Sequence, residues 1–154
     1  MKKLLTVLFF ISAIYMSFSS AQAHCQVPCG IYDDHARIHL MQEHAMTIEK
    51  ARKMITELQA EKQANKTNYN QIVRWIMTKE QHASEIQKIV NEYFLIQRIK
   101  MDWPDAKRNK FLNQLHKISV YAMQCKQSLD QASYSELNKA INAFEKSYID
   151  KDGK

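Results

Sequence analysis

The sequence predicts an all-α protein, an antiparallel up-down four-helix bundle preceded by an irregular N-terminal segment. The 154 residues include only two glycines and two prolines, so long stretches carry no residue that breaks a helix. Within these stretches apolar residues recur at steps of three, four and seven, the spacing of one helix face. Hydrophobic residues make up 45% of the chain, which is enough for the core of a single domain.

Residues 1–23 have the pattern of a secretory signal peptide. Two lysines give a positive start, residues 4–18 are mostly apolar, and Ala21-Gln22-Ala23 is typical of a cleavage site. An uncleaved membrane anchor fits less well because the apolar run is short, and no later segment is apolar enough to cross a membrane. We therefore expect export to the periplasm or the cell exterior, no membrane association after cleavage, and a mature domain of residues 24–154.

The first half of the mature chain predicts two helices joined by a turn. Asp33 and Asp34 can cap the first helix, which should end near Ala64. The polar stretch 65–68 is typical of a turn, and the second helix should follow it and break around Asp102-Trp103. The apolar positions that predict these helices are Ile38, Met41, Ala45, Ile48, Ile55 and Leu58 in the first, and Ile72, Trp75, Ile76, Ala83, Ile86, Val90, Tyr93 and Phe94 in the second.

The second half predicts two more helices. Pro104 suits the first turn of a third helix, and residues 133–136, Ser-Tyr-Ser-Glu, have the spacing of a capping box that opens a fourth. Cys125 should be a buried free thiol on the third helix. The apolar positions are Phe111, Leu112, Leu115, Ile118, Ala122 and Met123 in the third helix, and Leu137, Ala140, Ile141, Phe144 and Tyr148 in the fourth.

The charge of the chain is weak evidence about partners. Of the 22 basic residues, 20 follow residue 23, against 16 acidic residues, so the mature domain carries a net charge of +4. The lysines are dispersed at helical spacing and form no clustered stripe, which favours a solvated surface over a nucleic-acid groove. A small anion would still be attracted.

The segment that opens the mature domain differs from the rest of the chain. After cleavage His24 offers an α-amine and an imidazole, Cys25 an amide nitrogen and a thiolate, and Cys29 a second thiolate. Two nitrogens and two thiolates suit a square-planar ion, nickel or copper, better than tetrahedral zinc. Pro28 bends the segment and Gly30 permits the chain to turn back over the ion.

Other interpretations of this segment remain open. In an exported protein Cys25 and Cys29 could simply form a disulfide. The metal site is favoured because cleavage after Ala23 delivers His-Cys as the first two residues, which a disulfide loop does not need. The chain could also be an exported nickel or copper carrier without turnover, or a helical adaptor that binds no metal.

The motif His24-Cys25-x-x-Pro28-Cys29-Gly30-x-Tyr32-Asp33 resembles the nickel hook of nickel superoxide dismutases, and we call residues 24–32 the hook. Three shorter stretches are also similar to this family: residues 36–38, 79–81 and 92–94. The resemblance implies a four-helix protomer, assembly into a homohexamer and one nickel ion per subunit.

The resemblance also assigns roles to particular residues. It implies that His24, Cys25 and Cys29 are the nickel ligands, with the His24 imidazole axial. Superoxide would be disproportionated to dioxygen and hydrogen peroxide while nickel alternates between Ni(III) and Ni(II). Tyr32 and Tyr93 would line the approach to the metal; alternatively, Tyr93 could simply pack in the core.

The sequence departs from the family behind the axial imidazole. Where familiar members have a glutamate in the first helix and an arginine in the second, this chain has His39, after a one-residue gap, and His82. We expect these two histidines either to replace that ion pair or to be ordinary surface residues. His35, His44 and His116 are expected to be surface residues only.

Overall fold

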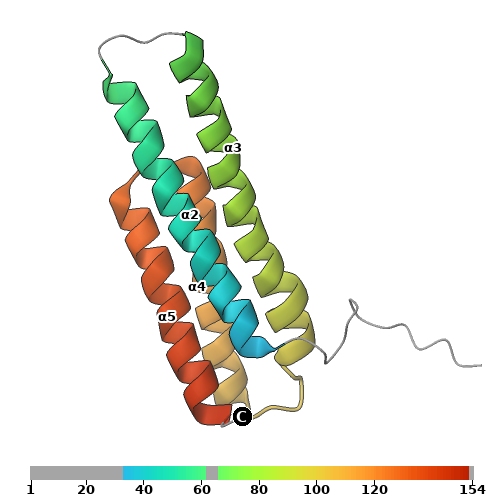
Figure 1. Ribbon diagram of the computed structural model, residues 1–154. Helices are drawn as coiled ribbons and strands as arrows, with labels where there is room; N and C mark the ends of the chain where they lie inside the picture. Colours follow the sequence, from blue (N-terminus) through green and yellow to red (C-terminus); the bar gives the residue numbers. More distant parts are fainter. Residues whose placement is uncertain (1–32, 62–65, 153–154) are drawn as a thin grey trace, which may run out of the picture.

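The computed structural model describes residues 33–61 and 66–152, and within these ranges every regular element is a helix, with no strand. The helices are α2 (Asp34–Ala60), α3 (Lys66–Lys88), the π-helix η1 (Ile89–Arg98), α4 (Asp105–Gln127) and α5 (Gln131–Asp152). Figure 1 shows η1 continuing α3 toward the end of the bundle where α2 begins. The predicted all-α class is confirmed, whereas the hook lies outside the described residues.

Short connections arrange the four helical segments as an up-down bundle. The pairs α2 and α3, α3 and α4, α4 and α5, and α5 and α2 are in contact, so each helix packs against two neighbours (Figure 1). The antiparallel four-helix bundle predicted from the four apolar stripes is therefore the observed architecture. Among the helices that the structure describes, none is long and apolar enough to cross a membrane.

The core follows the predicted helical spacing. On α2 the buried side chains are Ile38, Met41, Ala45, Ile48, Ala51 and Ile55, and on α4 they are Phe111, Leu115, Ile118, Ala122 and Cys125. Fully burying one such aliphatic side chain contributes about 1.5–3 kcal/mol. Three predicted core positions are wrong, since Ile76, Leu112 and Met123 are exposed at the margins of their stripes.

Aromatic rings fill the end of the bundle where α2 begins and α5 ends. Phe94 of η1 packs edge-to-face on Phe144 of α5, with ring centroids 4.9 Å apart. Phe111 of α4 lies 5.5 Å from Tyr148 of α5. Because such rings are large and pack in defined orientations, they fix the relative position of η1, α4 and α5.

Two predicted boundaries in the α2–α3 hairpin need correction. The Asp33 carboxylate accepts a hydrogen bond from the His35 backbone N–H at 2.9 Å, so the predicted cap of α2 is confirmed. However, α2 ends at Ala60 instead of near Ala64, and residues 66–68 belong to α3 instead of a turn. Asn68 explains the second error, because its side-chain amide donates to the Glu61 carboxylate across the hairpin while its backbone stays helical.

The starts of α4 and α5 also differ from the prediction. Pro104 directly precedes α4 as its cap residue, and its carbonyl accepts from the Arg108 N–H at 2.9 Å. The predicted capping box at 133–136 is wrong, since α5 begins two residues earlier, at Gln131. Ser128 organises the preceding turn instead, its hydroxyl accepting from the Asp130 N–H at 2.9 Å.

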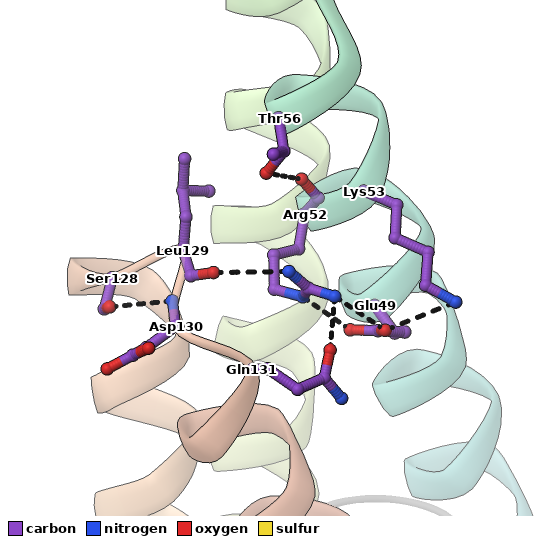
Figure 2. Close-up of polar contacts among 8 residues, drawn as sticks. All are labelled: Glu49, Arg52, Lys53, Thr56, Ser128, Leu129, Asp130 and Gln131. Atoms are coloured by element: carbon purple, nitrogen blue, oxygen red, sulfur yellow. Dashed lines mark hydrogen bonds and ion pairs between the residues drawn. The ribbon is translucent and has the colours of Figure 1, made fainter. Parts of the chain in front are cut away.

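An arginine on α2 holds this turn in place (Figure 2). Arg52 donates through Nε to Glu49 at 2.7 Å, through Nη1 to the Leu129 carbonyl at 3.4 Å and through Nη2 to the side chain of Gln131. The hydrogen bond from Arg52 is the main cause that lowers the pKa of Glu49. Beyond this contact α2 and α3 continue as a projecting hairpin (Figure 1).

Candidate functional site

The residues predicted to bind the metal, His24, Cys25 and Cys29, lie outside the described residues, as does Tyr32. The structure describes the surface to which the hook is joined. This surface begins at Asp33, the last residue of the hook motif, and continues with the first turn of α2.

A polar cluster gathers directly at this point. Tyr148 of α5 donates to Asp34 Oδ2 at 2.9 Å, and the hydroxyl of Tyr93 donates to Asp34 Oδ1. Arg98 donates through Nε to Asp34 Oδ1 at 2.6 Å and through Nη2 to the Tyr93 hydroxyl at 2.6 Å. We call these four residues the Asp34 cluster. It ties the first residue of α2 to both η1 and α5.

The π-helix makes the cluster possible. In an α-helix, residues 93 and 98 would lie about 140° apart around the axis. In η1 the backbone bonds span five residues, as in the bond from the Ile99 N–H to the Phe94 carbonyl at 2.9 Å, so residues five apart share a face. Tyr93 and Arg98 consequently face Asp34 together.

Burial and charge keep the Tyr93 hydroxyl protonated. Burial, followed by the hydrogen bond to Asp34, raises the pKa of Tyr93 to about 12. Two guanidinium groups lie near its ring, that of Arg98 at 4.7 Å and that of Arg37 at 5.6 Å from the centroid. At neutral pH the site thus holds a neutral phenol that donates to the Asp34 carboxylate and has Arg98 and Arg37 beside its ring.

Tyr93 packs in the core through its ring, as one of the two interpretations expected, and also makes polar contacts through its hydroxyl. Its ring is buried and packs edge-to-face on Phe94, with centroids 5.1 Å apart. Its hydroxyl reaches Asp34, one residue beyond the hook motif. Packing therefore fixes the ring while the polar end lies where the hook joins the bundle.

The two histidines that replace the family's glutamate and arginine have different partners in the structure. His82 of α3 pairs with His44 of α2, their Nδ1 atoms 2.8 Å apart. The expected contact of His39 with His24 involves a residue outside the described ranges and stays a prediction. His39 lies beside His35, with ring centroids 4.4 Å apart. His116 is exposed as expected.

His44 was wrongly expected to be a surface residue. It is half-buried, and burial followed by the neighbouring His82 lowers its pKa, while Glu85 and Glu43 act in the opposite direction. Since a hydrogen bond between two ring nitrogens needs one donor and one acceptor, the pair contains at least one neutral imidazole.

A groove of about 530 Å³ follows the first turns of α2 beside the cluster. Asp33 and Arg37 lie at its start, and His39 and Glu43 line it farther along the helix. The groove therefore adjoins the point where the hook joins the bundle, and both acidic and basic side chains line it.

Comparison with known proteins identifies the family. Residues 19–152 match the family model described as nickel-containing superoxide dismutase. The chain belongs to this family. No curated protein and no solved structure was found to match. The match covers most of the chain and establishes a nickel-containing enzyme with superoxide dismutase activity, in agreement with the resemblance of the hook.

The structure explains why a lysine stands at the first position of the Lys79-Glu80-Gln81 stretch that is similar to the family. Lys79 is only 3% exposed, and its ammonium donates to the backbone carbonyls of Cys125 and Lys126 at the end of α4. Cys125 is a buried free thiol, as predicted, and burial raises its pKa to about 11. Neither residue takes part in the Asp34 cluster.

Sequence reasoning missed most of the cluster. Asp34 was interpreted only as a helix cap and Tyr148 only as a core residue, and Arg98 was not noticed. Arg98 had no readable signal, because only the π-helix brings it onto the face of Tyr93. The sequence contains one indication. Asp34 and Tyr148 lie at the margins of the apolar stripes, and a tyrosine hydroxyl that becomes buried needs a hydrogen-bond partner such as a carboxylate.

Proposed function

We propose that this dismutase binds one nickel ion through the hook after cleavage behind Ala23. The ligands are the His24 amine and imidazole, the Cys25 amide and thiolate, and the Cys29 thiolate. This donor set would suit nickel because an anionic amide and two thiolates donate charge strongly to the ion. Support for the proposal comes from the family match together with this donor sequence.

Nickel bound there would supply the one-electron chemistry by alternating between Ni(III) and Ni(II). Two superoxide anions and two protons give one dioxygen and one hydrogen peroxide, so one anion is oxidised and the other is reduced. The chain must therefore attract an anion and provide access to protons at the same place.

The Asp34 cluster is suited to both tasks. The charge of Arg98 is offset by Asp34, and Arg37 adds a further positive charge beside the Tyr93 ring that can attract a small anion. The Tyr93 hydroxyl keeps its proton, since its pKa is raised to about 12, and Asp34 and Arg98 hold its orientation. In this proposal Tyr93, with Tyr32, orders water and substrate at the approach to the metal.

A test with chain beginning at His24 separates the possible functions. Metal analysis should find one nickel per subunit, and superoxide consumption should be lost in both Cys25→Ser and Cys29→Ser, because a hydroxyl does not replace a thiolate ligand at neutral pH. Cys125→Ser is the matched control and should keep full activity. Metal binding without superoxide consumption would indicate a carrier instead, and equal loss in all three variants would contradict the hook.

Processing provides an independent test of the amine ligand. Chain that retains Ala23 should bind nickel poorly and lack activity, because its α-amine is no longer beside Cys25. Mass spectrometry of exported protein should find His24 as the first residue, in the periplasm or the medium. A fully active uncleaved precursor would overturn the amine assignment.

The proposal includes a homohexamer. Tyr69, Val73 and Met77 repeat every four residues along α3 and are 62%, 54% and 65% exposed, an apolar stripe that suits contact with further copies of the chain. Native mass spectrometry should give six subunits, and Val73→Glu should produce smaller species. A wild-type monomer at micromolar concentration would contradict the hexamer.

A further inference from the structure

Three side chains with metal-ligating atoms converge on the outside of the bundle, where α2 faces α5. His35 and His39 lie one turn apart on α2, and Glu145 faces them from α5. Their ligand atoms all lie within 4.8 Å of one another. Two histidines four residues apart on a helix, joined by a carboxylate, form a known type of zinc-binding set.

The distances between these groups suit an ion better than direct hydrogen bonds. His35 Nε2 is 3.6 Å and His39 Nε2 is 3.9 Å from Glu145 Oε1, longer than hydrogen bonds of 2.7–3.2 Å. Bonds of about 2.1 Å to a four-coordinate ion place its ligand atoms about 3.4 Å apart. Small side-chain adjustments therefore bring all three atoms into a first coordination sphere.

A neighbouring amide holds the carboxylate in the orientation that such a site needs. Gln42, one turn after His39, donates through Nε2 to Glu145 Oε2 at 2.8 Å and to Asn142 Oδ1 at 3.1 Å. The second carboxylate oxygen is thereby occupied, and Oε1 is left directed at the imidazoles. Outer hydrogen bonds of this kind orient metal ligands in proteins.

We propose that His35, His39 and Glu145 bind a second divalent metal ion, separate from the nickel of the hook. Two imidazoles and one carboxylate suit an ion of borderline softness, such as zinc, with water in a fourth position. Both histidines are exposed, so the ion exchanges freely with solvent. It links the first two turns of α2 to α5, directly after the point where the hook joins the bundle.

The test uses full mature chain in which the side-chain donors of the hook are removed by His24→Ala, Cys25→Ser and Cys29→Ser. Zinc uptake is measured by equilibrium dialysis with Zn²⁺ alone, and we expect one ion per chain. Because the hook donors are absent, the result does not depend on whether the hook binds nickel. Failure of either proposal can thus be recognised separately.

Three further substitutions on this background locate the ion. His39→Gln and Glu145→Gln should each weaken zinc binding by about tenfold or more, and His116→Gln, the exposed control on α4, should leave it unchanged. Zinc should raise the melting temperature of the background chain and not that of the His39→Gln variant, since the ion joins two helices. Co²⁺ in place of zinc should give the visible absorption of a four-coordinate ion.

Three outcomes would overturn this site. One is that the background chain takes up no zinc. Another is that His39→Gln and Glu145→Gln bind zinc as tightly as the background. The third is that His44→Gln abolishes binding while His39→Gln does not, which would place the ion at the His44–His82 pair instead.

Discussion

Two arginine–carboxylate pairs lie at different levels of the bundle and do different work. Arg52 pairs with Glu49, one turn earlier on the same helix, and holds the turn that leads into α5 (Figure 2). Arg98 pairs with Asp34, 64 residues earlier in the chain. Two tyrosine hydroxyls also donate to Asp34, whereas the described contacts of Glu49 are with Arg52 and Lys53 alone.

The difference shows that the same kind of ion pair can have different roles. The Arg52–Glu49 pair stabilises a turn, whereas the Arg98–Asp34 pair belongs to the candidate functional site. Both arginines are mostly buried, with side chains 15% and 22% exposed, so burial does not distinguish them. What differs is the surroundings of the carboxylate. Two tyrosine hydroxyls donate to Asp34, next to the point where the hook joins the bundle. Glu49 instead lies beside the turn that leads into α5, far from this point.

Replacing Asp34 should have the largest effect. Asp34→Asn removes the charge that Arg98, Tyr93 and Tyr148 share, and we expect unfolding free energy to fall by about 2–3 kcal/mol. Activity per bound nickel should fall by about tenfold or more, because Tyr93 and Arg98 lose their charged acceptor. Urea unfolding measures the change in stability, and superoxide consumption normalised to nickel content measures the change in activity. Unchanged specific activity would make the cluster purely structural.

Tyr93→Phe tests the hydroxyl without removing the ring. The aromatic packing on Phe94 is kept, so stability should fall by only about 1–1.5 kcal/mol for the lost hydrogen bonds. Specific activity should still fall by about tenfold. Tyr148→Phe is the matched control, since it removes one bond to Asp34 and leaves Tyr93 in place. Equal activity loss in both variants would argue against a particular role for Tyr93.

Glu49→Gln should give the opposite result to Asp34→Asn. Stability should fall by about 1–2 kcal/mol, because Arg52 loses its charged partner, while specific activity stays unchanged. The lowered pKa of Glu49 means that its contribution is present above pH 4.5 and lost as the pH falls through the folded-state pKa. The difference from wild type should therefore shrink in acid, as urea unfolding at several pH values would show. A large loss of activity would break the contrast between the two pairs.

The His44–His82 pair should make stability depend on pH in a different range. Because the pKa of His44 is lowered, the unfolded chain binds its proton more readily, so stability is full above about pH 6.5 and decreases below it. His44→Gln should be less stable than wild type by about 1 kcal/mol at pH 7.5 and by less at pH 5. A difference that grew on acidification would contradict the direction of the shift.

The smallest effect is expected at Cys125. With its pKa raised to about 11 by burial, this thiol should not react with a thiol reagent at pH 8 in folded protein. Denaturation should expose it to modification. Rapid labelling of folded Cys25→Ser/Cys29→Ser protein would contradict the buried position.

Features that depend on neighbours in the sequence were predicted well. The apolar spacing gave the four helices and most of the core, because burial on one face repeats with the helical period. Asp33 was identified as a cap because its carboxylate reaches an N–H two residues away. The hook donors are likewise close together in the chain, but they lie outside the described residues, so their assignment as ligands stays a prediction.

Features that depend on distant partners were not predictable in this way. Residues 65–68 have the composition of a turn, but Asn68 donates to Glu61 and α3 begins at Lys66. Residues 133–136 have the spacing of a capping box, but Arg52 donates to the Gln131 side chain and α5 begins at Gln131.

The sequence by itself determined an all-α bundle and its apolar faces, and it is the source of the donor set proposed for the hook. Only the tertiary structure decided that Asp34, Tyr93, Arg98 and Tyr148 meet, and that His82 pairs with His44 instead of His39. The physical reason is that a helical period specifies which side of one helix is apolar, whereas the level and rotation at which two helices meet depend on packing across the bundle. A change from α- to π-helix in η1 shifts that rotation and brings Arg98 to the site.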